Sequence, residues 1–117
     1  MTRRHGLSEG TVAKIDRVLA RFPGVERALL FGSRAKGTYR NGSDIDIALE
    51  GSCLDWRTVG KIYDGLDDLL LPYRFSLIVH DKNTDSEVAA HIARVGIPLF
   101  ERQHFVEQVG MSSKPIP

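Results

Sequence analysis

Residues 31–47 are Phe31-Gly-Ser-Arg-Ala-Lys-Gly-Thr-Tyr-Arg-Asn-Gly-Ser-Asp-Ile-Asp-Ile47, a stretch that joins two predicted strands. The apolar segment 25–31 ends at a Gly-Ser turn, and a basic segment then leads to a second strand, 44–50. In that strand Asp44 and Asp46 alternate with isoleucines, so both carboxylates are expected on one face, about 7 Å apart at their Cα atoms. Aspartate is depleted in strands, and two on one face favour a function.

The paired carboxylates are candidate metal ligands. Mg²⁺ takes a few carboxylate oxygens and completes its coordination with water and phosphate oxygens. We therefore predict that Asp44 and Asp46 bind metal and are catalytic. Each also has a simpler explanation when it is taken singly. Asp44 can belong to the turn 41–44, and Asp46 can face solvent from a two-sided strand.

The Gly-Ser turn is a candidate phosphate site. Gly32 and Ser33 offer backbone N–H groups and a hydroxyl, and glycine lets a ligand approach the backbone closely. The basic residues that follow, Arg34 and Lys36, can neutralise a triphosphate. These four residues are therefore predicted to bind a nucleotide. As an alternative, Ser33 is an N-cap, the usual role of serine at a helix start.

The rest of the chain alternates between helical and strand patterns. The expected elements are a helix over 8–21, strands over 25–31 and 44–50, a helix over 55–71, a strand over 73–79, a helix over 86–95 and a short edge strand over 97–101. This order predicts an α/β (α+β) fold, with one small mixed sheet flanked by helices. We expect a single domain over residues 1–109 and a flexible C-terminal tail over 110–117.

Composition narrows the class of protein. The 117 residues carry 16 Lys+Arg against 15 Asp+Glu, a formal charge of +1, which gives no reason to expect generic binding to nucleic acid or to a membrane surface. One cysteine excludes an internal disulfide, and four scattered histidines make a structural zinc site a poor prediction. No apolar run approaches the roughly 18 residues of a membrane span, and no apolar stretch follows the basic start. We expect a cytoplasmic protein.

The motif resembles that of a known family. Gly32-Ser33, ten intervening residues and Asp44-Ile45-Asp46 resemble the GS-x10-DxD signature of the DNA polymerase β-like nucleotidyltransferase superfamily. The short chain is most similar to the minimal nucleotidyltransferases, and the resemblance extends over residues 8–101. It implies a nucleotidyltransferase-type fold, with two Mg²⁺ ions held by the paired aspartates. It also implies that the Gly-Ser turn grips the β- and γ-phosphates of ATP or another nucleoside triphosphate.

The resemblance also implies a reaction and a partner. In such enzymes an acceptor hydroxyl attacks the α-phosphorus and pyrophosphate leaves. Several minimal members are antitoxins that pair with a helical HEPN-domain protein, and some transfer AMP from ATP to a hydroxyl of that partner. We therefore expect a Mg²⁺-dependent transferase of this antitoxin type.

One position departs from the family pattern. The superfamily supplies a third carboxylate from a neighbouring strand, as a metal ligand and base, but the matching position here is Ser76. Strand alternation independently places Ser76 on the polar face of 73–79. A binding module that has lost catalysis and docks on a HEPN-type partner is therefore the alternative function. A third reading is a small α/β protein whose aspartate pair only solubilises a strand.

Three further interpretations concern residues outside the motif. Glu50 shares the face of Asp46 but lies about 13 Å further along the strand, too far to replace the missing carboxylate. His80 and Asp81 follow the third strand and are more typical of solvated strand ends. Trp56 is interpreted as a core anchor, with an interface residue as the alternative.

Overall fold

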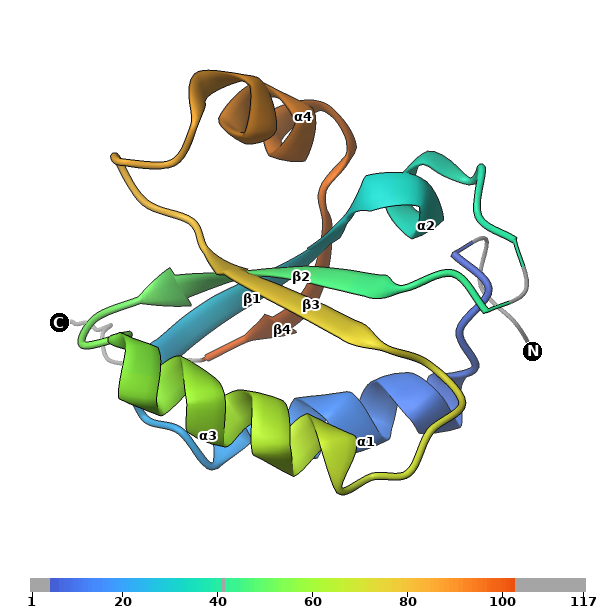
Figure 1. The fold of residues 1–117 in the computed structure, drawn as a ribbon, viewed down its shortest axis with the longest axis horizontal. Coiled ribbons are helices and arrows are strands. Elements are labelled where there is room, and N and C mark those ends of the chain that lie inside the picture. Colours follow the sequence, from blue (N-terminus) through green and yellow to red (C-terminus); the bar gives the residue numbers. More distant parts are fainter. Residues whose placement is uncertain (1–4, 41, 103–117) are drawn as a thin grey trace, which may run out of the picture.

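The computed structural model describes residues 5–40 and 42–102, and it shows a four-stranded sheet with helices on both faces (Figure 1). The elements are α1 (Glu9–Ala20), β1 (Val25–Phe31), α2 (Gly32–Lys36), β2 (Ile45–Gly51), α3 (Trp56–Asp67), β3 (Phe75–Val79), α4 (Ser86–Val95) and β4 (Ile97–Glu101). The predicted fold class is confirmed. The predicted tail, 110–117, lies outside the described residues.

The sheet is mixed, with the strand order β3-β2-β1-β4. β1 pairs antiparallel with both β2 and β4, whereas β2 and β3 run parallel. Parallel neighbours need a long crossover, and α3 provides it. β2, which carries the aspartate motif, is therefore an inner strand with a partner on each side.

The helix boundaries follow local capping chemistry. Ser8 caps α1 by accepting a hydrogen bond from the Thr11 N–H, and Asp55 caps α3 in the same way through Thr58. The predicted helix over 55–71 is too long. It ends at Asp67, and Leu70 has φ +55°, a left-handed conformation that a continuing helix excludes.

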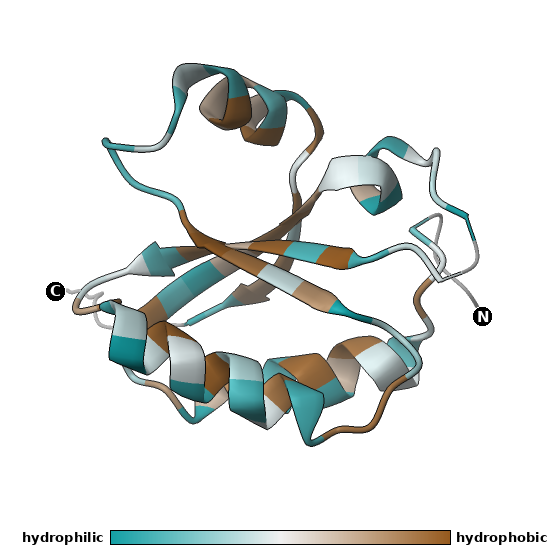
Figure 2. Cartoon of the chain, in the orientation of Figure 1, coloured by the Kyte–Doolittle hydropathy of each residue, from teal (hydrophilic) through white to brown (hydrophobic). Residues whose placement is uncertain are grey.

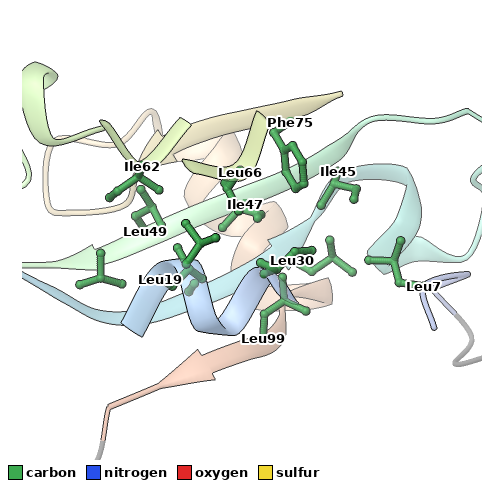
Figure 3. Close-up of a cluster of buried hydrophobic side chains, with 14 of the residues drawn as sticks. Leu7, Leu19, Leu30, Ile45, Ile47, Leu49, Ile62, Leu66, Phe75 and Leu99 are labelled. Atoms are coloured by element: carbon green, nitrogen blue, oxygen red, sulfur yellow. The ribbon is translucent and has the colours of Figure 1, made fainter. Parts of the chain in front are cut away.

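The two faces of the sheet differ in the size of the hydrophobic cluster packed against them. In Figure 1, α1 and α3 lie below the sheet while α2 and α4 lie above it. The hydrophobic sides of α1 and α3 meet the sheet (Figure 2), and Figure 3 shows the side chains that fill this layer, which include Leu19, Leu30, Ile47, Ile62 and Leu66. On the other face, within the part of the chain that the structure describes, the buried hydrophobic cluster is smaller and consists of Leu29, Ala48 and Ile92. The larger hydrophobic cluster therefore lies on the side of α1 and α3.

The interpretation of Trp56 as a core anchor is wrong. Trp56 is the first residue of α3, its side chain is 79% exposed, and Arg57 lies over its ring at 5.3 Å. It lines a groove of about 660 Å³ between α3 and β3, together with Tyr63 and Leu77. This groove lies on the face of the sheet opposite Asp46. Within the described ranges, 5–40 and 42–102, no helix is both long and apolar enough to cross a bilayer.

Candidate active site

The aspartate pair lies where β2 begins. Asp44 is exposed and immediately precedes the strand, and Asp46 is half-buried on the face that α2 and α4 cover. Its neighbours Ile45 and Ile47 are fully buried on the other face, as the alternation predicts. Burial raises the pKa of Asp46, and the nearby Asp44 carboxylate raises that pKa further. A cation bound at these carboxylates would relieve this unfavourable charge.

The Gly-Ser turn lies directly against Asp46. Phe31, the last residue of β1, pairs with Asp46 across the antiparallel ladder, so Gly32 begins α2 beside the carboxylate. Gly32 has φ +73°, and a Cβ at this position would collide with the Asp46 carboxylate. Glycine is therefore required here both by the backbone conformation and by the close approach. The ten-residue spacing of the motif therefore allows the Gly-Ser turn to lie against Asp46.

Arg34 is placed differently from the other predicted phosphate ligands. Ser33 and Lys36 share one side of the short helix α2, at i and i+3, whereas Arg34 points into the fold. Arg34 is 2% exposed. Its guanidinium donates to the carbonyls of Ser43 and His5 at 3.0–3.2 Å and lies within 4.9 Å of two tyrosine ring centres. The geometry therefore does not favour the predicted contact between Arg34 and a triphosphate. Arg34 instead fastens the loop before β2 to the N-terminal segment.

β3 carries Ser76, the position at which the family resemblance implies a third carboxylate. Ser76 pairs with Asp46 across the parallel β2–β3 ladder and is exposed, which agrees with the predicted alternation. Over residues 5–40 and 42–102 no group of three or more His, Cys, Asp or Glu side chains could hold a metal ion. The acidic part of the site is therefore the pair of Asp44 and Asp46.

Residues 13–105 match the family model described as polymerase beta, nucleotidyltransferase. The chain belongs to this family. The match covers most of the sequence and includes the Gly-Ser turn, both aspartates and the strand that carries Ser76.

Solved structures agree with this nucleotidyltransferase assignment. A mutant form of the toxin–antitoxin pair MntA–HepT is 26% identical, with a TM-score of 0.61 over 83% of this chain and 75% of that chain. A toxin–antitoxin complex with AMP-PNP is 24% identical, with a TM-score of 0.58 over 83% and 76%. A tri-AMPylated HEPN toxin from Shewanella oneidensis in complex with an MNT antitoxin is 19% identical, with a TM-score of 0.58 over 82% and 74%. Among curated proteins no match was found.

The donor set of this nucleotidyltransferase fits Mg²⁺ that arrives with a nucleotide. Magnesium is usually bound by one or two carboxylates plus water and substrate phosphates, and seldom by a cage of protein ligands alone. Asp44 and Asp46 supply the carboxylates, and the adjacent Gly-Ser turn is suited to phosphate.

The structure adds one residue that the sequence did not indicate. The Gly32 N–H donates a hydrogen bond to His91 Nε2, at 3.0 Å, although the two residues are 59 positions apart. The imidazole, on α4, also packs edge-on against the Phe31 ring, with 6.2 Å between ring centroids. In the sequence His91 is merely a polar residue beside the buried Ile92, so no local pattern marks it.

Glu50 and His80 form a separate cluster at the other end of β2. Glu50 accepts hydrogen bonds from Arg27 Nε at 2.7 Å and from His80 Nδ1 at 2.6 Å. Burial raises the pKa of Glu50, but the hydrogen bonds from Arg27 and His80 outweigh this, and the net pKa is lowered. His80 is therefore half-buried and hydrogen-bonded, which differs from the interpretation of this residue as a solvated strand end.

Proposed function

We propose that this chain is a Mg²⁺-dependent nucleotidyltransferase that transfers AMP from ATP to a hydroxyl of a protein partner, as an antitoxin toward a HEPN-type toxin. One observation carries the proposal: Gly32 lies against the Asp46 carboxylate, which brings a phosphate-binding turn and a metal-binding pair into one site. Family membership supports the reaction class. The AMP-PNP complex and the AMPylated HEPN toxin among its structural neighbours support the nucleotide and the partner.

Each residue of the site has a role in this proposal. Asp44 and Asp46 hold the metal, and Gly32 and Ser33 bind phosphate oxygens. Lys36, exposed on the same side of α2 as Ser33, adds positive charge beside the triphosphate. Mg²⁺, when bound, neutralises charge on the oxygens around the reacting phosphorus. The proposal places the protein in the cytoplasm, where ATP and Mg²⁺ are supplied.

A second function rests on Ser76. Its hydroxyl stands beside Asp46, where the family has a carboxylate, and it is neutral at pH 7. In this alternative the fold persists as a binding module that occludes a HEPN-type toxin without modifying it. The two functions make the same prediction for docking and opposite predictions for transfer.

Calorimetry tests the proposal without knowledge of the acceptor. ATP is titrated into the purified protein with and without Mg²⁺, beside an Asp44→Asn/Asp46→Asn variant. A Glu50→Gln variant is the matched control, because Glu50 lies on the same strand outside the site. The proposal expects Mg²⁺-dependent binding that the double variant loses and the control keeps. Equal binding by all three proteins would contradict the proposal. If binding is lost only in the double variant, the next experiment measures transfer of label from ATP onto a HEPN-type protein.

A further inference from the structure

The backbone amide of Gly32 already has a partner. A backbone N–H carries one hydrogen, and that of Gly32 points at His91 Nε2, 3.0 Å away. Since Nε2 is the acceptor, this nitrogen carries no proton. The ring is half-buried and lies edge-on to Phe31, so its position is set by packing as well as by the hydrogen bond. His91 thus fills the acceptor position at the turn that the proposed function assigns to phosphate.

The strand order shows on which side of the site His91 acts. Asp46 on β2 lies between Ser76 on β3 and the Gly32 turn at the end of β1. His91 contacts the β1 side. It is therefore on the side of the triphosphate, opposite the position that the missing carboxylate would occupy, and is not a replacement for that carboxylate.

We propose that His91 is a positioning residue. In the free protein it accepts the hydrogen bond of the Gly32 N–H, and when nucleotide binds, a triphosphate oxygen replaces it as the acceptor. The inference rests on the proposed function. A phosphate oxygen and the unprotonated Nε2 are both acceptors, and they compete for one hydrogen. Binding therefore breaks the bond between α4 and the turn, and His91 lowers the affinity for nucleotide while it holds the empty turn in its left-handed conformation.

The competition predicts that removal of the acceptor tightens nucleotide binding. His91→Phe keeps a ring against Phe31 but leaves the Gly32 amide free, whereas His91→Gln offers an oxygen in place of Nε2. We expect His91→Phe to bind Mg-ATP about fivefold more tightly than wild type, which is the net worth of a typical hydrogen bond, and His91→Gln to stay near wild type. The measurement is calorimetric titration of the full chain, after thermal unfolding has shown that each variant is folded.

Nitrogen NMR of the wild-type protein gives a readout that needs no variant. The Nε2 resonance of His91 should shift when Mg-ATP saturates the site, because this nitrogen loses the hydrogen bond from the Gly32 N–H. A resonance that does not move at saturation, or a His91→Phe variant that binds Mg-ATP equally or more weakly, overturns the role of His91 and leaves the proposed function intact. If neither wild type nor His91→Phe binds Mg-ATP, the proposed nucleotide site fails and the role of His91 fails with it.

Discussion

Asp46 and Glu50 lie on the same strand and on the same face of the sheet, but their surroundings differ. Glu50 accepts hydrogen bonds from two side chains of its own chain, the Arg27 guanidinium and the His80 ring, and its pKa is lowered despite burial. The pKa of Asp46 is raised, because the side chain is half-buried and the Asp44 carboxylate is nearby. One carboxylate is neutralised within the fold, and the other retains unfavourable charge.

The difference separates a structural carboxylate from a functional one. Hydrogen bonds and ion pairs within the chain favour the charged form of Glu50, so a bound cation would have less unfavourable charge to relieve there. Two neighbouring carboxylates, one of them half-buried, beside a glycine with a positive φ are unfavourable for the fold alone, and such conflicts occur at functional sites. The comparison therefore predicts that substitutions at the two ends of β2 separate activity from stability.

The largest expected effect is on nucleotide transfer. Asp46→Asn should reduce transfer by at least about 100-fold, because a catalytic metal contributes several kcal/mol to transition-state stabilisation. Glu50→Gln should leave transfer within about twofold of wild type, as expected for a substitution outside the site. Initial rates of label transfer from ATP onto the partner check both. If the two variants lose activity equally, the comparison does not hold.

Gly32 should be the most sensitive glycine of the motif. Gly32→Ala combines a strained positive φ with a collision at Asp46, and we expect the free energy of unfolding to fall by about 2–3 kcal/mol. Gly37 is the matched control. It also has a positive φ, 84°, but no atom lies within 4 Å of an added Cβ. Gly37→Ala should cost about 1 kcal/mol. Urea denaturation measures both, and equal losses would contradict the close approach of Gly32 to Asp46.

A carboxylate at position 76 should strengthen the metal site. Ser76→Asp places a third acid in register with Asp46, and we expect about tenfold tighter Mg²⁺ binding and faster transfer. Without Mg²⁺ the same variant should be less stable by up to about 1 kcal/mol, because like charges then face each other across the ladder. Ser76→Asn is the neutral control of equal size. A gain of transfer in Ser76→Asp alone favours the enzyme, and no gain in either variant favours the binding module.

Glu50 should matter for stability and not for nucleotide. Glu50→Gln weakens the hydrogen bonds from Arg27 and His80, and we expect a loss of about 1 kcal/mol in the free energy of unfolding. Glu101→Gln, at an exposed position, should change it by less than about 0.5 kcal/mol. Chemical denaturation at pH 7 distinguishes them. If Glu101→Gln loses as much stability as Glu50→Gln, the loss arises from the general charge balance of the protein and not from the hydrogen bonds to Glu50.

The smallest effect is on the pH dependence of stability. Glu50 has a lowered pKa, so its contribution is present above its ordinary value of 4.5 and is lost as pH falls through the folded pKa. Asp46 has a raised pKa, so the folded state takes up its proton first, and its effect on stability becomes more favourable as pH falls. Denaturation between pH 7 and pH 3 should therefore show a steeper acid loss in Asp46→Asn and a shallower one in Glu50→Gln. The reverse order would contradict the two pKa directions.

Local sequence patterns predicted most of the helices and strands, and the faces on which Asp46 and Ser76 lie. Helical spacing and capping residues predicted α1 nearly to the residue, and alternation placed Ile45, Asp46 and Ser76 on their correct faces. The helix over 55–71 was too long because Leu70 adopts a left-handed conformation that hydrophobic spacing does not reveal.

Arg34 shows why composition is a weaker guide than periodicity. A basic residue next to a Gly-Ser turn suggests a phosphate ligand, but whether it faces the site depends on the direction of a one-turn helix and on where Tyr39 and Tyr73 lie. Trp56 is the converse case. A large apolar side chain suggests the core, but its place at the N-terminal end of α3 leaves it exposed.

The elements that depend on neighbours along the chain were encoded in the sequence: the turn at Gly32, the alternating strand at Asp46 and the absent carboxylate at Ser76. Tertiary structure alone determined the hydrogen bond from Gly32 to His91, the burial of Arg34 and the pairing of Glu50 with His80. The physical reason is the range of each interaction. Periodicity and capping act over a few residues, whereas these contacts form only after the sheet has brought together segments that are far apart in the chain.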